Sequence, residues 1–296
     1  MLINTCTGVP PRVPLGREPG PRVRKGGRRR DANRGVHRLE RDWVLASMTD
    51  PTSSVRTPEY RIEGSGPLLI YVAGLDGTGE LFYKQAPLLV STYRVVTFRS
   101  RDSGRFNYED LASDLAAIIR DQAEPRATIV GESFGGTVAL HFALDYPEMV
   151  ERLVIINSFP RFRKRLKIKL ASALAARLPF RMLWAFRRAA NSLGLLVDGV
   201  RREDRRIFWR AIRTVSAQAY ARRLQLITEF DIEQRLSEIH APTLLIAGDR
   251  DLLIPSVKEA HAMAARMPNA TVKVIKRAGH ACLMGGRVRL AELLAE

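Results

Sequence analysis

Short apolar runs, separated by polar and glycine-rich turns, recur along the chain from residue 68 to residue 276. Runs of this length that carry β-branched residues predict buried strands at 68–73, 127–130, 152–157, 242–248 and 271–276. Helical patterns follow at 136–144 and at 256–267, the second with Ser256 predicted as its N-cap. This alternation predicts an α/β fold with a mostly parallel, doubly wound sheet.

The sequence Gly131-Glu132-Ser133-Phe134-Gly135 lies directly between a predicted strand and a predicted helix. In this context the pattern is typical of a nucleophile elbow, a turn so tight that glycine is needed on both sides of the serine. The turn would hold the Ser133 hydroxyl above the sheet and direct the backbone N–H of Phe134 to the same point. Ser133 is therefore the predicted nucleophile. The alternative is a surface turn whose serine has no chemical role.

Carboxylates and a histidine follow the last two predicted strands. Asp249 and Asp251 come after strand 242–248, and His280 comes after strand 271–276. The carboxyl ends of parallel strands form the ligand side of such a sheet. Because a serine hydroxyl is a weak nucleophile, His280 would take its proton and return it to the leaving group. Asp249 or Asp251 would orient the imidazole and stabilise the imidazolium.

A glycine-rich loop at 74–79 follows strand 68–73. Glycines allow backbone amides to approach a ligand closely. We expect the N–H groups of Leu75 and Phe134 to form an oxyanion hole. A plain glycine turn and a phosphate cradle are the alternatives. The second is disfavoured, since the Lys-Ser/Thr ending of a phosphate-binding loop is absent.

Together these features resemble the α/β-hydrolase superfamily, from about residue 60 to residue 296. The matching pieces are 73–79, 101–105, 108–111, 131–135, 248–251 and 279–280. The order Ser133, Asp251, His280 is the triad order of that fold, and the family's acid commonly lies three residues after a glycine, which selects Asp251. The resemblance implies a helical lid before the acid-bearing strand. The loop begins Ala73-Gly74 where the family often has His-Gly.

The formal net charge of +17 is distributed unevenly. Residues 1–47 hold 11 Lys/Arg and 4 Asp/Glu, residues 158–240 hold 19 and 7, and the rest hold 18 and 20. We therefore expect a basic disordered tail at 1–47, a hydrolase core at 48–157 and 241–296, and a basic helical lid at 158–240. The tail is either an extension ahead of a natural start at Met48 or a basic arm for an anionic partner.

The predicted lid combines an apolar stripe with many basic residues. Leu166, Leu170, Leu174 and Leu178 recur every four residues among lysines and arginines. Such a helix either packs over the active site or lies on an anionic membrane surface. No nucleic-acid module is recognised, so no nucleic acid is expected as a partner. No apolar run approaches the ~20 residues of a membrane span, which favours a cytoplasmic protein, with peripheral membrane association as the alternative.

The expected activity is hydrolysis of a carboxylic ester or thioester, with a hydrophobic acyl group, through an acyl-Ser133 intermediate. This chemistry needs no cofactor, and no metal-ligand spacing of Cys or His is present. Cys6 and Cys282 are not expected to form a disulfide. The alternatives are an acyltransferase that uses the same triad and a hydrolase-like receptor for a small ligand.

Overall fold

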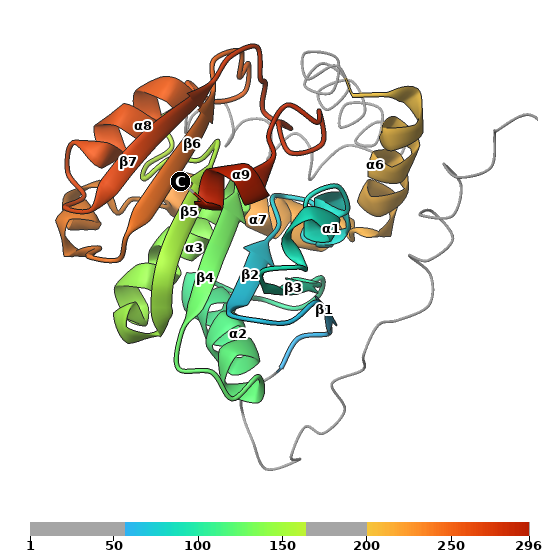
Figure 1. Cartoon of the computed structure of the whole chain (residues 1–296), viewed down its shortest axis with the longest axis horizontal. Coiled ribbons are helices and arrows are strands. Elements are labelled where there is room, and N and C mark those ends of the chain that lie inside the picture. The colour runs from blue at the N-terminus through green and yellow to red at the C-terminus, as the bar shows by residue number, and fades with distance from the viewer. Residues whose placement is uncertain (1–56, 164–199, 296) are drawn as a thin grey trace, which may run out of the picture. The chain divides into compact units, whose positions relative to one another are not determined.

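The computed structural model describes residues 57–163 and 200–295, which form an α/β fold around a seven-stranded sheet (Figure 1). The strands are β1 Tyr60–Glu63, β2 Leu68–Val72, β3 Arg94–Phe98, β4 Ala127–Glu132, β5 Val150–Ile156, β6 Thr243–Gly248 and β7 Ala270–Ile275. Their order is β1-β3-β2-β4-β5-β6-β7, and all neighbours are parallel except β1 and β3. The predicted mostly parallel, doubly wound sheet is confirmed.

The helices alternate with these strands along the chain. They are α1 Ala86–Leu89, α2 Tyr108–Asp121, α3 Phe134–Asp145, α6 Arg202–Thr214, α7 Ala217–Glu229, α8 Ser256–Ala264 and α9 Leu290–Ala295, with 3₁₀ turns η2 Glu80–Phe82, η3 Pro147–Met149 and η4 Glu233–Glu238. The start of α2 is set by a capping box, in which the side chains of Asn107 and Asp110 each accept the other's backbone N–H.

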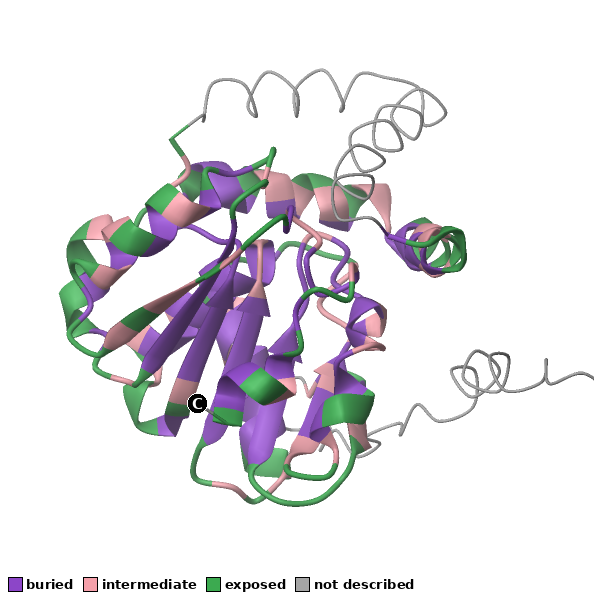
Figure 2. Cartoon of the chain, turned by 45° about the horizontal axis from the view of Figure 1, so that its top comes forward, coloured by how far each residue is buried: buried purple, intermediate pink, exposed green. Residues whose placement is uncertain are grey.

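Helices cover both faces of the sheet, because successive strand side chains point to opposite faces. Ile70 and Val72 belong to a core that includes residues of α2, α3 and α8. Leu69 and Tyr71 belong to the core on the other face, which includes residues of α1 and α9. Burial on both faces explains why the central strands are almost wholly apolar. Figure 2 shows them as a buried layer between helices that expose their outer sides.

The strand register brings the carboxyl ends of five parallel strands, β2 and β4 to β7, to one edge of the sheet. Val72 of β2 pairs with Gly131 of β4, and Glu132 at the end of β4 pairs with Ile156 at the end of β5. Ile156 in turn pairs with Ile246 of β6, whose last residues run beside the end of β7. The loops that follow β2, β4, β6 and β7 therefore emerge together, where ligands bind in open α/β sheets.

The described part of the predicted lid consists of α6, α7 and η4, which lie between β5 and β6 in the chain. The predicted leucine stripe, Leu166, Leu170, Leu174 and Leu178, lies outside the described residues, as do the basic tail 1–47 and Cys6. No helix among the described residues is long and apolar enough to cross a membrane.

Candidate active site

Ser133 occupies a strained turn between β4 and α3. Its backbone has φ +56° and ψ −118°, a conformation that L-residues rarely adopt and that costs about 1–3 kcal/mol. A Cβ added to Gly131 would lie 2.5 Å from the carbonyl oxygen of Gly135. A Cβ added to Gly135 would lie 2.0 Å from the carbonyl oxygen of Val72. Both glycines are therefore required by backbone contacts, as the elbow pattern predicts.

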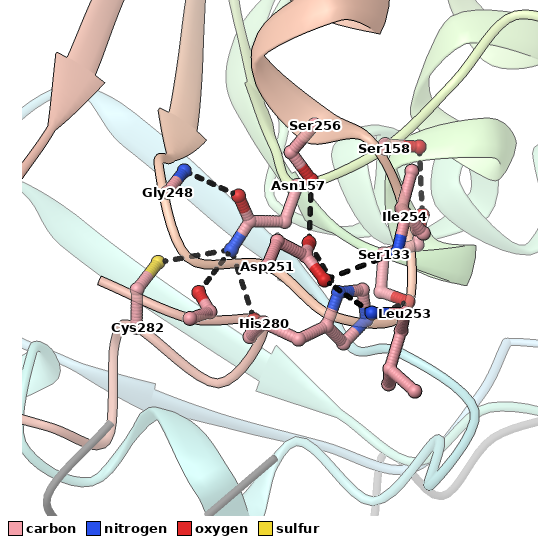
Figure 3. A network of polar contacts seen from close by, with 11 residues as sticks. Ser133, Asn157, Ser158, Gly248, Asp251, Leu253, Ile254, Ser256, His280 and Cys282 are labelled. Carbon is pink, nitrogen blue, oxygen red and sulfur yellow. Dashed lines mark hydrogen bonds and ion pairs between the residues drawn. The ribbon is translucent and has the colours of Figure 1, made fainter. Parts of the chain in front are cut away.

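The structure brings Ser133, His280 and Asp251 together in one hydrogen-bonded line (Figure 3). The Oγ of Ser133 lies 2.8 Å from Nε2 of His280, and Nδ1 of His280 lies 2.8 Å from Oδ2 of Asp251. The Asp251 side chain is almost wholly buried, while that of His280 keeps 16% of its surface exposed. This geometry allows the imidazole to accept the serine proton while the carboxylate holds the other ring nitrogen.

Four hydrogen-bond donors hold the carboxylate of Asp251. Its Oδ1 accepts the backbone N–H groups of Leu253 and Ile254 at 2.9 and 3.1 Å, and its Oδ2 accepts the Ser256 hydroxyl and faces His280. Burial alone would raise the pKa of Asp251. The bond and charge of His280, with the bonds from Ser256 and Ile254, outweigh burial and hold this pKa below its usual value.

The prediction that Ser256 is the N-cap of the following helix is wrong. The N-cap position of α8 is Pro255, and Ser256 is the first residue of the helix. Its hydroxyl donates to Asp251 rather than accepting a backbone N–H of α8. This bond to the buried carboxylate five residues earlier is charge-assisted and directs the hydroxyl toward Asp251.

Asp249, the alternative acid, has a different environment. It is exposed, and its Oδ1 accepts the backbone N–H of Arg277 at 2.6 Å. Arg277 has φ +60°, so this bond supports a tight turn after β7. The structure therefore brings Asp251, and not Asp249, to the imidazole of His280.

The two predicted oxyanion donors are the N–H of Phe134, which follows Ser133 directly, and that of Leu75, in a loop that contacts the elbow. Phe134 is the first residue of α3, where N–H groups lack intrahelical acceptors and the helix dipole favours negative charge. In the loop after β2, the Gly74 carbonyl accepts the Gly77 N–H at 3.0 Å. The Leu75 N–H belongs to the same planar trans peptide as that carbonyl and points the opposite way. A Cβ on Gly74 would lie 3.5 Å from the Ser133 Cβ, so the loop contacts the elbow.

A buried arginine behind this loop was not predicted from the sequence. Arg223 of α7 is 1% exposed, and its guanidinium donates to the carbonyl oxygens of Leu75, Asp76 and Arg101 at 2.9, 3.3 and 2.8 Å. The only sequence signal is its spacing, since Arg223 falls on the helical face that also buries Ala219 and Leu226. Nothing else distinguishes it from the many other basic residues of segment 158–240.

Within the part of the chain that the structure describes, no group of three or more His, Cys, Asp or Glu side chains could hold a metal ion. The candidate site that the structure describes is the Ser133–His280–Asp251 line, and the N–H groups of Leu75 and Phe134 remain its predicted oxyanion donors. Cys282, the described cysteine, is buried and lies 3.3 Å from the amide nitrogen of Asn157.

Comparison with known proteins gives matches that cover most of the chain. A family model described as "alpha/beta hydrolase fold" matches residues 67–286. The chain is similar to a protein of Stutzerimonas stutzeri named "Putative carbamate hydrolase RutD", at 29% identity over 75% of this chain and 87% of that protein. A homologue of that name from Pseudomonas syringae is 28% identical, over 73% and 87% of the two chains.

Solved structures show the same fold. A hydrolase from Pseudomonas aeruginosa superposes with a TM-score of 0.71 at 22% identity, covering 80% of this chain and 92% of that one. The enol-lactonase of Burkholderia xenovorans also superposes with a TM-score of 0.71, at 20% identity over 82% and 97% of the two chains.

Proposed function

This chain belongs to the alpha/beta hydrolase fold family, and from that premise we propose that it cleaves a carboxylic ester or thioester through an acyl-Ser133 intermediate. The observation that carries the proposal is the line of contacts from Ser133 Oγ through the His280 ring to Asp251, with both distances at 2.8 Å. Each distance lies within the range over which a nucleophile, its base and the group that orients the base act together.

In the acylation half of the reaction, Ser133 Oγ attacks the substrate carbonyl carbon while its proton passes to Nε2 of His280. The carbonyl oxygen gains the negative charge and accepts the N–H groups of Leu75 and Phe134. Asp251, whose pKa is held low, stays ionised and stabilises the imidazolium. Collapse of the tetrahedral intermediate breaks the bond to the alcohol or thiol, which leaves with the proton held on His280.

In the second half, water replaces the leaving group. His280, now neutral, takes a proton from the water as its oxygen attacks the acyl carbon. The second tetrahedral intermediate releases the carboxylic acid, and Ser133 Oγ regains its proton from Nε2. If an alcohol took the place of water, the same steps would give an acyltransferase, which remains the alternative enzymatic function.

A carbamate is the second substrate class, favoured by the name that the similar proteins carry. Carbamates present the same kind of carbonyl carbon to a serine nucleophile, so the triad and oxyanion donors would act on them unchanged. The hydrophobic acyl group of the ester proposal is supported by Leu252 and Leu253. They follow Asp251 directly and are 57% and 45% exposed, so the turn that carries the acid exposes two large apolar side chains.

A fluorophosphonate probe tests the nucleophile. The purified protein should be labelled, and Ser133→Ala should abolish labelling and lower turnover by roughly 10⁶-fold. Ser103→Ala, which alters an exposed loop serine, is the matched control and should be labelled normally. Unchanged labelling of Ser133→Ala would refute the assignment.

A substrate panel then tests the bond that is cleaved. Aryl esters, acyl-thioesters and carbamates should be compared by kcat/KM, each at graded acyl chain length. Each CH₂ that becomes buried contributes about 0.8 kcal/mol, so kcat/KM should rise about fourfold per carbon while the acyl pocket is being filled. A preference for short carbamates would favour the second substrate class. Tight ligand binding with no turnover of any class would favour the receptor alternative.

A further inference from the structure

Asn157 connects the segments that carry two members of the candidate triad. It follows β5 directly, is 1% exposed, and has a left-handed backbone with φ +47°. Its Oδ1 accepts the backbone N–H of Gly248 at 2.8 Å. Its Nδ2 donates to the carbonyl oxygens of Gly279 and His280, both at 2.9 Å (Figure 3). One buried amide thus bonds both to the end of β6, three residues before Asp251, and to His280 itself.

The chemistry of this position favours asparagine. The amide supplies one acceptor oxygen and two donor hydrogens, and the three backbone partners need this combination. Asparagine also tolerates positive φ better than most other residues. A leucine of similar size would leave three buried backbone groups without these bonds, and an aspartate would set a carboxylate oxygen against two carbonyl oxygens.

The two segments that Asn157 joins already touch closely at this point. A Cβ added to Gly248 would lie 2.4 Å from the Ala278 carbonyl oxygen and 2.7 Å from that of Gly279. This contact therefore sets the separation between the turn after β6, which carries Asp251, and the loop after β7, which carries His280.

A different side chain, Gln85, holds the part of the chain that follows His280, from Leu283 to Leu290. The Nε2 of Gln85 donates to the carbonyl oxygens of Leu283 and Val288 at 3.0 and 2.9 Å, and its Oε1 accepts the Leu290 N–H at 3.0 Å. Gln85 is also buried, at 2% exposure. Gln85 and Asn157 are thus both buried amides with three backbone bonds, of which all three of Gln85 and two of Asn157 lie on the segment that follows β7; of the two, Asn157 is the one that bonds to the residue that carries the imidazole.

We propose that Asn157 is a positioning residue of the hydrolase, which fixes His280 and the turn of Asp251 relative to each other so that Nε2 meets the Ser133 hydroxyl. This role rests on the proposed function, because it acts through the triad. It is distinct from a general contribution to core stability, since it predicts a loss of turnover larger than the loss of folding explains.

The test compares Asn157→Ala with Gln85→Ala as a matched control, using the best ester of the panel. At a temperature where both variants are folded, Asn157→Ala should lower kcat about 100-fold, the usual effect of a displacement near 1 Å, and change KM little. Gln85→Ala should lose comparable stability and keep kcat within about threefold of wild type. Equal kcat values for the two variants at matched folded fractions would overturn the proposal.

A spectroscopic measurement makes the test independent of substrate choice. The Nδ1–H of His280 bonded to Asp251 should give a low-field proton NMR signal in the wild-type protein and in Gln85→Ala. The signal should broaden or vanish in Asn157→Ala. Its persistence there would overturn the positioning role, whereas a wild type that hydrolyses nothing would instead count against the proposed function.

Asn157→Asp is the second variant, in case the alanine variant does not fold. It keeps the shape, the tolerance of positive φ and the acceptor for Gly248, but replaces the donor that faces Gly279 and His280. It should show the same loss of kcat and of the low-field signal. Wild-type turnover in a folded Asn157→Asp protein would contradict the proposal.

Discussion

The guanidinium of Arg223 donates a hydrogen bond across 2.9 Å to the carbonyl oxygen of Leu75, in the loop that carries one proposed oxyanion donor. Arg223 belongs to α7, within the segment whose sequence predicts a lid. The described part of that segment therefore also holds the loop that contains Leu75. The guanidinium bonds to three backbone carbonyl oxygens, and the N–H of each of those peptide planes points to the opposite side.

Arg223→Lys should lower kcat while the protein stays folded. A lysine ammonium is a compact donor without the planar fork that reaches three carbonyl oxygens, so the loop would shift and the Leu75 N–H would be misplaced. We expect a loss of about 10- to 100-fold in kcat with little change in KM, because the lost bond acts on the transition state.

Arg222→Lys is the control for this change. Arg222 is the neighbouring residue and donates to the Phe106 carbonyl oxygen, which lies outside the oxyanion loop. Its replacement should leave kcat within about threefold of wild type. Similar kinetics for the two lysine variants would show that Arg223 contributes to stability alone.

Asp251→Asn should cost roughly 10⁴ in turnover, since an amide in this place favours the wrong tautomer of His280. Asp249→Asn should cost far less, because an asparagine oxygen can still accept the Arg277 N–H. Both variants should be assayed with unfolding curves as a check on structure. The reverse ranking, in folded proteins, would transfer the acid role to Asp249.

The elbow glycines give a prediction on stability. Gly135→Ala would set a Cβ 2.0 Å from a backbone carbonyl oxygen, so the sheet or the helix must move. We expect a loss of about 3 kcal/mol or more in the free energy of unfolding, together with loss of probe labelling. Gly104→Ala is the control, since Gly104 has φ +75° but open space around it. It should lose only about 1–2 kcal/mol from backbone strain and keep its labelling.

These residues also show what could be read from the sequence. Ser133, Asp251 and His280 each follow an apolar run, and β4, β6 and β7 begin and end within two residues of the predicted strands. The local pattern of apolar residues was sufficient to predict these three residues, because each lies in the turn directly after a strand. β1 and β3 were not predicted, since the first is four residues long and both contain polar residues.

Asn157 and Arg223 could not be predicted because their roles depend on partners far away in the chain. Asn157 bonds to a residue 122 positions later, and Arg223 to one 148 positions earlier. No local periodicity encodes such contacts. The error on Ser256 has the same cause on a shorter scale. Ser256 is a residue type that favours capping, but it lies one residue past the N-cap position and its hydroxyl donates to the buried carboxylate of Asp251.

The stability of the fold should depend on pH through Glu259, a buried residue of α8. Burial raises the pKa of its carboxyl, and the charge of Arg163 offsets this only in part. A carboxyl whose pKa is higher in the folded state stabilises the fold at low pH and loses that contribution as pH rises through the folded pKa. The advantage of Glu259→Gln over wild type in unfolding free energy should therefore grow from about pH 4 to pH 7.

The opposite sign is expected for Glu238→Gln, which serves as the control. The hydrogen bond from Arg235 holds the pKa of Glu238 below its usual value, so this exposed carboxylate stabilises the fold above its unfolded pKa and loses that effect in acid. Denaturant unfolding at a series of pH values measures both variants. The same pH trend in the two would contradict the assignment of Glu259.

The contact with an anionic membrane stays a prediction, and the structure of α6 indicates which residues would make it. Its exposed side carries arginines at positions 202, 206, 210 and 213, a spacing that sets them on one helical face, while Phe208, Ala211 and Ile212 are buried. A basic face of this kind is attracted to anionic lipid by about 1 kcal/mol per residue, and salt screens the attraction. The protein should therefore sediment with vesicles that contain phosphatidylserine and not with neutral phosphatidylcholine vesicles.

Replacing two of these arginines tests the contact directly. Arg202→Gln combined with Arg206→Gln should weaken binding to the anionic vesicles by about 30-fold, the effect of two such residues, and leave hydrolysis of a small soluble ester unchanged. Lys258→Gln combined with Lys276→Gln removes the same charge from exposed positions on α8 and after β7, at the sheet edge opposite β1. If binding is a property of the α6 face, this control should bind nearly as wild type does. Equal weakening by both pairs would mean that only net charge matters, and equal binding to neutral and anionic vesicles would remove the electrostatic mechanism.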